Sequence, residues 1–137
     1  MLTENEFIVN SRIQVDELTS ALKRKKLFLE DIGDIIPGFI HLNDCNSHQM
    51  TYLNKMGQEE WETSLEEIKT RGMDWLLDIC HKDVLKQSFD KIKIFNKIDD
   101  GFGILSYYQF ARKPSNDNYQ WYFTSKKRFD NNTFISI

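Results

Sequence analysis

The sequence predicts an α+β protein, in which a five-stranded antiparallel sheet carries helices on one face and follows an N-terminal amphipathic helix. The hydrophobic spacing is helical over residues 12–30 and 63–97, and it changes to the alternation typical of strands after Gly101. A shorter pair of strand patterns precedes the helices at residues 39–53. Neither group of strands could close a core alone, so we expect both groups to join one sheet.

Length and composition limit the class of protein. A chain of 137 residues with 40% hydrophobic and 28% charged residues is typical of one globular domain. A net charge of −3 argues against direct binding of nucleic acid or of an anionic membrane. No apolar run approaches the roughly 18 residues of a membrane span, and the start MLTENEF lacks the features of a signal peptide. We therefore expect a cytoplasmic protein in which Cys45 and Cys80 stay reduced.

The first helix is expected over residues 12–30. Its apolar residues recur at spacings of three, four and seven and form a seam along one face, made of Val15, Leu18, Leu22 and Leu29. This seam packs either on the helix's own domain or on its copy in a homodimer, for which it offers only about two and a half heptads. We assign residues 1–30 to this dimerisation or linker helix and residues 31–137 to the main domain.

A hairpin that runs directly into a helix is expected over residues 37–62. Residues 39–42 form the first strand, a turn rich in Asn and Asp follows at residues 43–47, and the second strand ends at Leu53. Asn54 stands where a helix N-cap belongs, before a helix-compatible stretch at residues 55–62.

The helical insertion continues to residue 97. Ser64 and Glu67 have the spacing of a capping box, and Gly72 is a suitable end for the helix that they begin. A short apolar helix is expected at residues 73–79 and a longer amphipathic helix at residues 82–97.

Three strands complete the pattern. Residues 104–111 and 119–125 alternate with a period of two, and residues 133–137 begin a third strand that the end of the chain cuts short. Short polar loops separate the strands, which predicts an antiparallel meander.

This order of elements resembles that of PAS domains. The residues that carry the resemblance are Gly38, Asn43-Asp44 at the end of the first strand, Tyr52-Leu53-Asn54 and His81-Lys82-Asp83-Val84. The last motif departs from the His-Pro-Asp/Glu-Asp that is frequent in the family. The resemblance extends from Pro37 to about Phe129 and more weakly to the end.

The resemblance implies a sensory module of a bacterial signal-transduction or transcription-regulatory protein. In the family, the concave face of the sheet packs against the intervening helices, and the space between them holds the ligand. The effector, a histidine kinase or a DNA-binding regulator, would lie outside this chain, because neither pattern is present here. The expected assembly is a homodimer.

Apolar and aromatic residues of the strands and helices are the candidates for a ligand pocket. They are Ile40, His41, Leu42, Met56, Trp61, Trp75, Leu76, Phe89, Ile92, Ser106, Tyr108, Phe110, Trp121 and Phe123. Such a lining suits a small apolar ligand, with His41, Ser106 and Tyr108 as polar anchors. The alternative is a filled core in a protein-interaction or dimerisation module. A shift of one residue in the strands would exchange the two faces.

No catalytic residue, metal or cofactor is expected. Cys45-x-x-His48 and Cys80-His81 are not two well-spaced chelating pairs. Residues 83–97 lack the histidine that haem-binding PAS domains carry on this helix, and neither cysteine has the neighbours found in flavin photosensors. Motifs for a nucleophile or a phosphate-binding loop are missing. A third alternative is a small cone-shaped α+β enzyme that uses His41.

Overall fold

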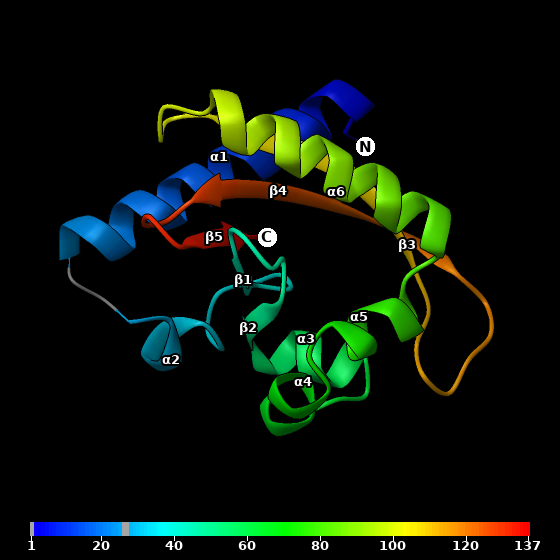
Figure 1. The fold of residues 1–137 in the computed structure, drawn as a ribbon. Coiled ribbons are helices and arrows are strands. Elements are labelled where there is room, and N and C mark those ends of the chain that lie inside the picture. The colour runs from blue at the N-terminus through cyan, green and yellow to red at the C-terminus, as the bar shows by residue number, and fades with distance from the viewer. Residues whose placement is uncertain (1, 26–27) are drawn as a thin grey trace.

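A computed structural model describes residues 2–25 and 28–137. Eleven elements follow one another in these ranges, with two strands, a series of helices and then three strands after the first two helices (Figure 1). They are α1 (Glu4–Lys25), α2 (Leu29–Ile32), β1 (His41–Asp44), β2 (Met50–Leu53), α3 (Lys55–Glu60), α4 (Leu65–Arg71), α5 (Met73–Ile79), α6 (Lys82–Ile98), β3 (Ile104–Ala111), β4 (Gln120–Arg128) and β5 (Thr133–Ser136). No described helix is both long and apolar enough to cross a bilayer.

The five strands form one antiparallel sheet in the order β2-β1-β5-β4-β3. β5 is the central strand and joins the first hairpin to the late meander. The structure thus confirms the predicted fold class, the five strands and the meander.

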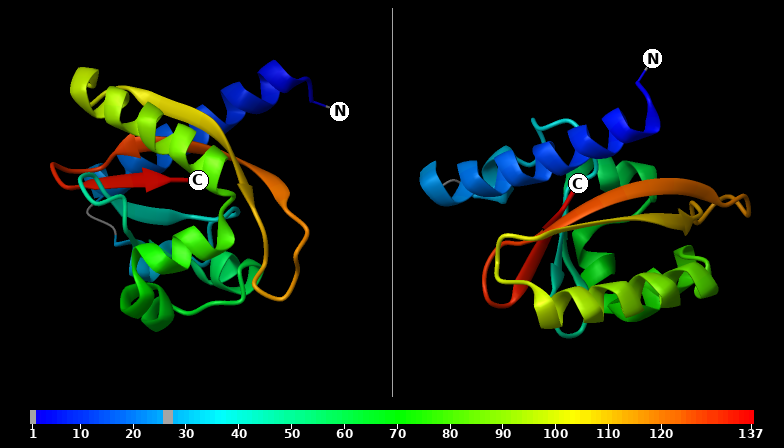
Figure 2. Two further views of the ribbon diagram at one scale, coloured as in Figure 1. Left: turned by 45° about the vertical axis from the view of Figure 1, so that its right-hand side comes forward. Right: turned by 90° about the horizontal axis from the view of Figure 1, so that it is seen from above.

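Helices cover both faces of the sheet: the helices of the insertion lie on one face, as predicted, and α1 covers the other. The right view of Figure 2 shows β3 and β4 between α1 on one side and α6 on the other; α1 packs against both strands and α6 against β3. Helices α3, α4 and α5 gather on the side of α6, beside β2 (Figure 1). We call the sheet face toward α6 the inner face and the face toward α1 the outer face.

The first helix begins at Glu4, eight residues before the predicted start at Arg12. Thr3 and Glu6 form a reciprocal cap: the Glu6 amide donates to Thr3 Oγ1 (3.2 Å), and the Thr3 amide donates to Glu6 Oε2 (2.7 Å). This Thr-x-x-Glu spacing is the sequence signal that identifies the true start. The predicted continuity to residue 30 is wrong at its end, because α1 stops at Lys25 and α2 is separate; residues 26–27 lie outside the described ranges.

The apolar seam of α1 is occupied within the chain. Val15, Leu18, Leu22 and Leu29 are all buried in a cluster with Ile40 and Ile135 of the sheet. These four side chains therefore do not present an exposed dimer surface, which corrects their assignment as the homodimer contact. The helix packs on its own sheet because the outer face would otherwise expose Ile40 and Ile135 to water.

The predicted caps in the helical insertion are confirmed. Asn54 Oδ1 accepts from the Gly57 amide (3.2 Å), and Ser64 Oγ accepts from the Glu67 amide (3.1 Å). Gly72 ends α4 with φ = +56°, a conformation that a side chain would strain. These local signals determine where α3 and α4 begin and where α4 ends.

β4 is longer than predicted. Residues 119–125 were expected to form the strand, but pairing continues to Arg128, with Lys126 opposite Ser136 and Arg128 opposite Phe134. The polar run Lys126–Arg128 remains extended because β5 supplies hydrogen-bonding partners along its edge.

Candidate functional site

A cavity of about 80 Å³ lies between the inner face of the sheet and helices α5 and α6. Most of its lining is apolar, as in ligand-binding sites generally. The lining residues are His41, Asn43, His48, Met50, Trp61, Trp75, Leu76, Ile79, Cys80, Leu85, Phe89, Ile92, Tyr107, Gln109, Ala111, Tyr122, Thr124 and Lys126.

The structure brings some of the predicted pocket residues together at this cavity. They are His41, Trp61, Trp75, Leu76, Phe89 and Ile92. Five of the six are apolar side chains from the helical insertion, where the helical spacing identifies the buried face directly.

The other candidates lie elsewhere. Ile40 and Leu42 pack in the cluster beneath α1, and Met56 is exposed. On the outer face, Ser106 shares a hydrogen bond with Ser125 (2.9 Å). The aromatic candidates of the late strands also lie on the outer face and pack on one another there: Tyr108, Phe110, Trp121 and Phe123.

The correction in β3 and β4 is a shift of one residue. Tyr107, opposite Thr124, and Gln109, opposite Tyr122, face the cavity, so the phase of both strands is the reverse of the expected one. The sequence could not decide the phase, since both faces of these strands are rich in aromatic residues and α1 buries part of the second face.

Several residues of the site were missed. Asn43 was assigned to the turn, and Lys126 lay beyond the expected end of its strand. The pairing of β1 with β5 places Asn43 on the inner face, opposite Phe134. The pairing of β4 with β5 places Lys126 on the same face, opposite Ser136. Alternation from Tyr122 onwards would have found Lys126, once β4 was known to continue.

His41, Asn43 and Lys126 form a polar cluster at the cavity wall. Asn43 Oδ1 lies 2.8 Å from His41 Nδ1 and accepts a hydrogen bond from Lys126 Nζ at 3.4 Å. Asn43 Nδ2 donates to the His48 carbonyl oxygen (3.1 Å). The ammonium also lies over the rings of Tyr107 (5.9 Å) and Phe134 (5.4 Å). Asn43 thus positions both neighbouring side chains.

The charge states in this cluster follow from burial. Burial, and then the positive charge of Lys126, lower the pKa of His41 to about 3, so its imidazole is neutral and Nδ1–H can donate to Asn43. Burial also lowers the pKa of Lys126 to about 8, so the ammonium form still dominates at pH 7. The cavity wall therefore carries one positive charge.

Three further polar atoms of lining residues are buried without a partner. Two are indole donors, Nε1 of Trp61 and of Trp75, and one is an acceptor, Gln109 Oε1. Buried polar groups nearly always have hydrogen-bonding partners, so a bound ligand could supply the partners that these three atoms lack.

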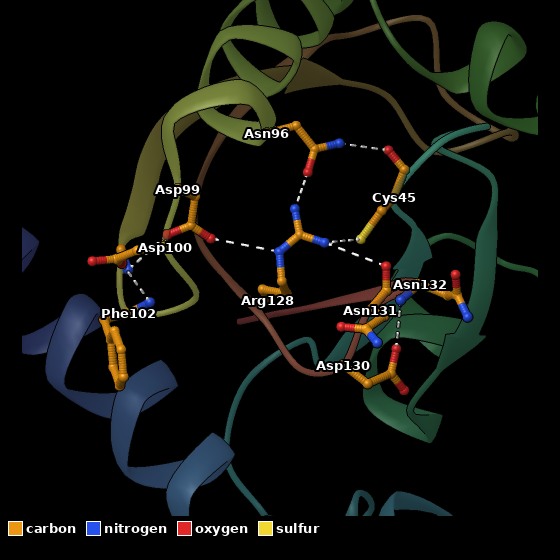
Figure 3. Close-up of polar contacts among 10 residues, drawn as sticks. Cys45, Asn96, Asp99, Asp100, Phe102, Arg128, Asp130, Asn131 and Asn132 are labelled. Carbon is orange, nitrogen blue, oxygen red and sulfur yellow. Dashed lines mark hydrogen bonds and ion pairs between the residues drawn. The ribbon is translucent and has the colours of Figure 1, made fainter.

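Arg128 fastens α6 to the sheet near this wall (Figure 3). Its guanidinium contacts Asn96 and Asp99 at the end of α6, with Nε 3.6 Å from Asp99 Oδ2, and donates to the Asn131 carbonyl oxygen (3.4 Å). Asn96 Nδ2 in turn donates to the Cys45 carbonyl oxygen (2.9 Å). The network holds the end of α6 against β1 and the turn between β4 and β5.

Both cysteines are buried and free. Burial raises the pKa of Cys80 to about 12, which makes its thiol a poor nucleophile at neutral pH. Among the side chains that the structure describes, no group of three or more His, Cys, Asp or Glu could hold a metal ion.

The sheet order, the helical insertion on the inner face and the cavity between them define the PAS fold. Comparison with solved structures shows the same fold in the crystal structure of the PAS domain of an HTR-like protein from Haloarcula marismortui. The two share 12% sequence identity with a TM-score of 0.60, over 89% of this chain and 96% of that one. No family model and no curated protein sequence matches this chain. The resemblance read from the residues is confirmed for the fold.

Proposed function

We propose that this chain is a non-catalytic sensory domain that binds a small, mostly apolar ligand in the cavity. The cavity itself carries the proposal: a largely apolar space with a few convergent polar groups is the usual composition of a ligand site. The PAS fold of a transducer-like protein supports a signalling role. The effector, a histidine kinase or a DNA-binding regulator, would lie outside this sequence.

β4 offers a route for the signal, because it contacts the cavity and α1 with alternate residues. Thr124 and Lys126 face the cavity. Ser125 and Lys127 face the other way: Ser125 Oγ lies 2.7 Å from Ser11 Oγ, and Lys127 Nζ lies 2.5 Å from Asp16 Oδ1. In our proposal the ligand favours one arrangement of β4 and α1, and the effector responds to that arrangement.

The proposed homodimer would use surfaces other than the buried seam. On the side of α1 away from the seam, Val9 and Ile13 are exposed. A contact there would leave the packing of the seam undisturbed and would place α1 between the sheet and the partner.

Mass spectrometry tests the ligand directly. Native and denatured masses of the purified wild type are compared with those of Leu76→Phe, which fills the cavity, and of Leu77→Phe, the matched control. Leu77 is the exposed neighbour of Leu76 on α5 and does not line the cavity. We expect a mass that is lost on denaturation in the wild type and Leu77→Phe, and less of it in Leu76→Phe.

A bare polypeptide mass in all three proteins, together with no stabilisation by a panel of small compounds, would favour the filled-core interaction module instead. The small volume of the cavity is the observation that favours this second candidate. For a ligand that is found, hydrogen exchange tests the route: we expect its binding to slow exchange in β4 and α1, and unchanged exchange in α1 would contradict the relay.

A further inference from the structure

Lys126 is a buried cation without an anionic partner. Its exposed fraction is 3%, and it forms none of the ion pairs among the described residues. An ammonium has three donors, but its one hydrogen bond is the long contact of 3.4 Å with Asn43 Oδ1. A buried charge is normally paired, because removal from water is otherwise costly.

The groups around the ammonium do not supply the missing charge. His41 and His48 lose protonation through burial and the field of Lys126, Tyr107 is a neutral phenol, and the Cys45 thiol has a raised pKa. Asn43 is an amide. Because all these neighbours are uncharged, the charge of Lys126 remains unbalanced at the cavity wall.

Of the three other unpartnered polar atoms of the lining, two are donors and one, Gln109 Oε1, is an acceptor. The indole Nε1–H groups of Trp61 and Trp75 are buried without acceptors. Indole nitrogens can only donate, and so can an ammonium. The bound group that completes such a site is an acceptor with a negative charge.

We propose that the cavity binds a short aliphatic monocarboxylate, whose carboxylate pairs with Lys126 and whose chain lies among Leu85, Phe89 and Ile92. This inference deepens the proposed function and rests on it. A carboxylate accepts several hydrogen bonds and neutralises the ammonium, whereas the apolar lining of α5 and α6 matches a hydrocarbon chain.

The volume restricts the length of the chain. A cavity of 150 Å³ holds benzene, and the cavity here measures about 80 Å³. By that standard it accommodates on the order of three non-hydrogen atoms, so only the smallest carboxylates, acetate and then propionate, come near its size.

The test uses pairs of probes that differ in charge and little in shape: propionate with propionamide, and acetate with acetamide. Binding to the full chain is titrated by NMR shifts of backbone amides, with sodium chloride holding the ionic strength constant. We expect propionate to bind about tenfold tighter than propionamide or better, since the ion pair in a buried site is lost with the amide.

Variants locate the carboxylate. Lys126→Met keeps an unbranched side chain, one atom shorter, and removes the charge; we expect it to bind propionate at least about tenfold more weakly. Lys86→Met is the matched control at an exposed position of α6 and should bind as the wild type does. Should Lys126→Met fail to fold by circular dichroism, the comparison of propionate with propionamide in the wild type still decides the question.

Each remaining outcome overturns the inference. If neutral compounds bind in the cavity and carboxylates do not, the carboxylate proposal fails and the proposed sensory function stands. If propionate binds equally well to Lys126→Met, the carboxylate lies elsewhere. If neither the acids nor the neutral analogues bind, the inference fails, and the mass measurement above decides separately whether the cavity holds any ligand.

Discussion

At the scale of the single residue, the site depends on the environment of Lys126. This side chain has a charge, an apolar surrounding of Tyr107 and Phe134, and one weak hydrogen-bonding partner. Such an arrangement disfavours the charged form in the folded state, which explains the direction of its pKa shift. Without ligand, Lys126 destabilises the fold; with an anion bound, the same residue would contribute to affinity.

The lowered pKa of Lys126 should make the free energy of unfolding depend on pH. Burial lowers the pKa of Lys126 from 10.5 to about 8, so the unfolded state binds more protons above pH 8. The destabilisation is therefore complete below pH 8 and disappears as the pH rises toward 10.5. We expect the free energy of unfolding of Lys126→Met to exceed that of the wild type by about 3 kcal/mol at pH 7 and by roughly 1 kcal/mol at pH 9.5.

Urea unfolding of both proteins at the two pH values measures the difference. Buried thiols and phenols such as Cys80 lose stability at high pH, but they contribute equally to both proteins and cancel. Lys86→Met, at an exposed position, should show no change with pH. An equal gap for Lys126→Met at pH 7 and pH 9.5 would mean that Lys126 titrates as in water.

At the scale of the element, Asn54 provides partners for four backbone groups in three segments of the chain. Its Oδ1 accepts from the amides of Gly57 and Ile40, and its Nδ2 donates to the carbonyl oxygens of Gly33 (3.1 Å) and Gly38 (2.8 Å). The residue thus caps α3 and also fixes the approach to β1. Asn54 is only 1% exposed, so water cannot replace it as the hydrogen-bonding partner of these backbone groups.

Asn54→Ala should therefore cost much more than the loss of a cap. We expect a loss on the order of 3–4 kcal/mol in the free energy of unfolding, because three buried backbone groups and one partly buried one lose their partner. Ser64→Ala, which removes the exposed cap of α4, should cost about 1 kcal/mol. Chemical denaturation of both variants makes the comparison, and equal losses would show that Asn54 acts as a cap alone.

At the scale of the whole molecule, α1 is a structural layer. Its seam is buried against the outer face, and the ion pair of Lys127 with Asp16 adds a polar contact. The sheet is therefore enclosed by α1 on one face and by α3 to α6 on the other. The packing on both faces contributes to the same free energy of unfolding. A ligand that shifts the inner face acts on a structure that includes α1.

This packing predicts one cooperative unfolding transition. The loss of helix by circular dichroism and the change in tryptophan fluorescence, to which the buried Trp75 of α5 contributes, should coincide in denaturant. Val15→Asp places a charge in the buried seam and should lower the free energy of unfolding by more than about 3 kcal/mol. Ile13→Asp, at an exposed position of the same helix, should change it by less than roughly 1 kcal/mol. Helix that melts before the fluorescence changes would instead indicate an independent α1.

Sequence by itself determined the elements of this protein. Hydrophobic periodicity, the caps at Asn54 and Ser64 and the stop at Gly72 are local properties, since they depend on residues within a turn or two of one another. The strand and helix order, and through it the resemblance to PAS domains, followed from these signals. The helical contributions to the cavity, such as Trp75 and Phe89, followed as well, because a helix with one apolar face has one way to turn it inward.

Only the tertiary structure decided which face of the late strands is the inner one. Tyr107 and Tyr108 are both aromatic, so neither polarity nor period distinguishes them. The choice depends on pairing between segments far apart in the chain and on α1 burying the second face. The same long-range pairing extends β4 and carries Lys126 into the cavity wall. From sequence alone a charged residue is predicted to be exposed, because its burial depends on neighbours that only the packed molecule brings together.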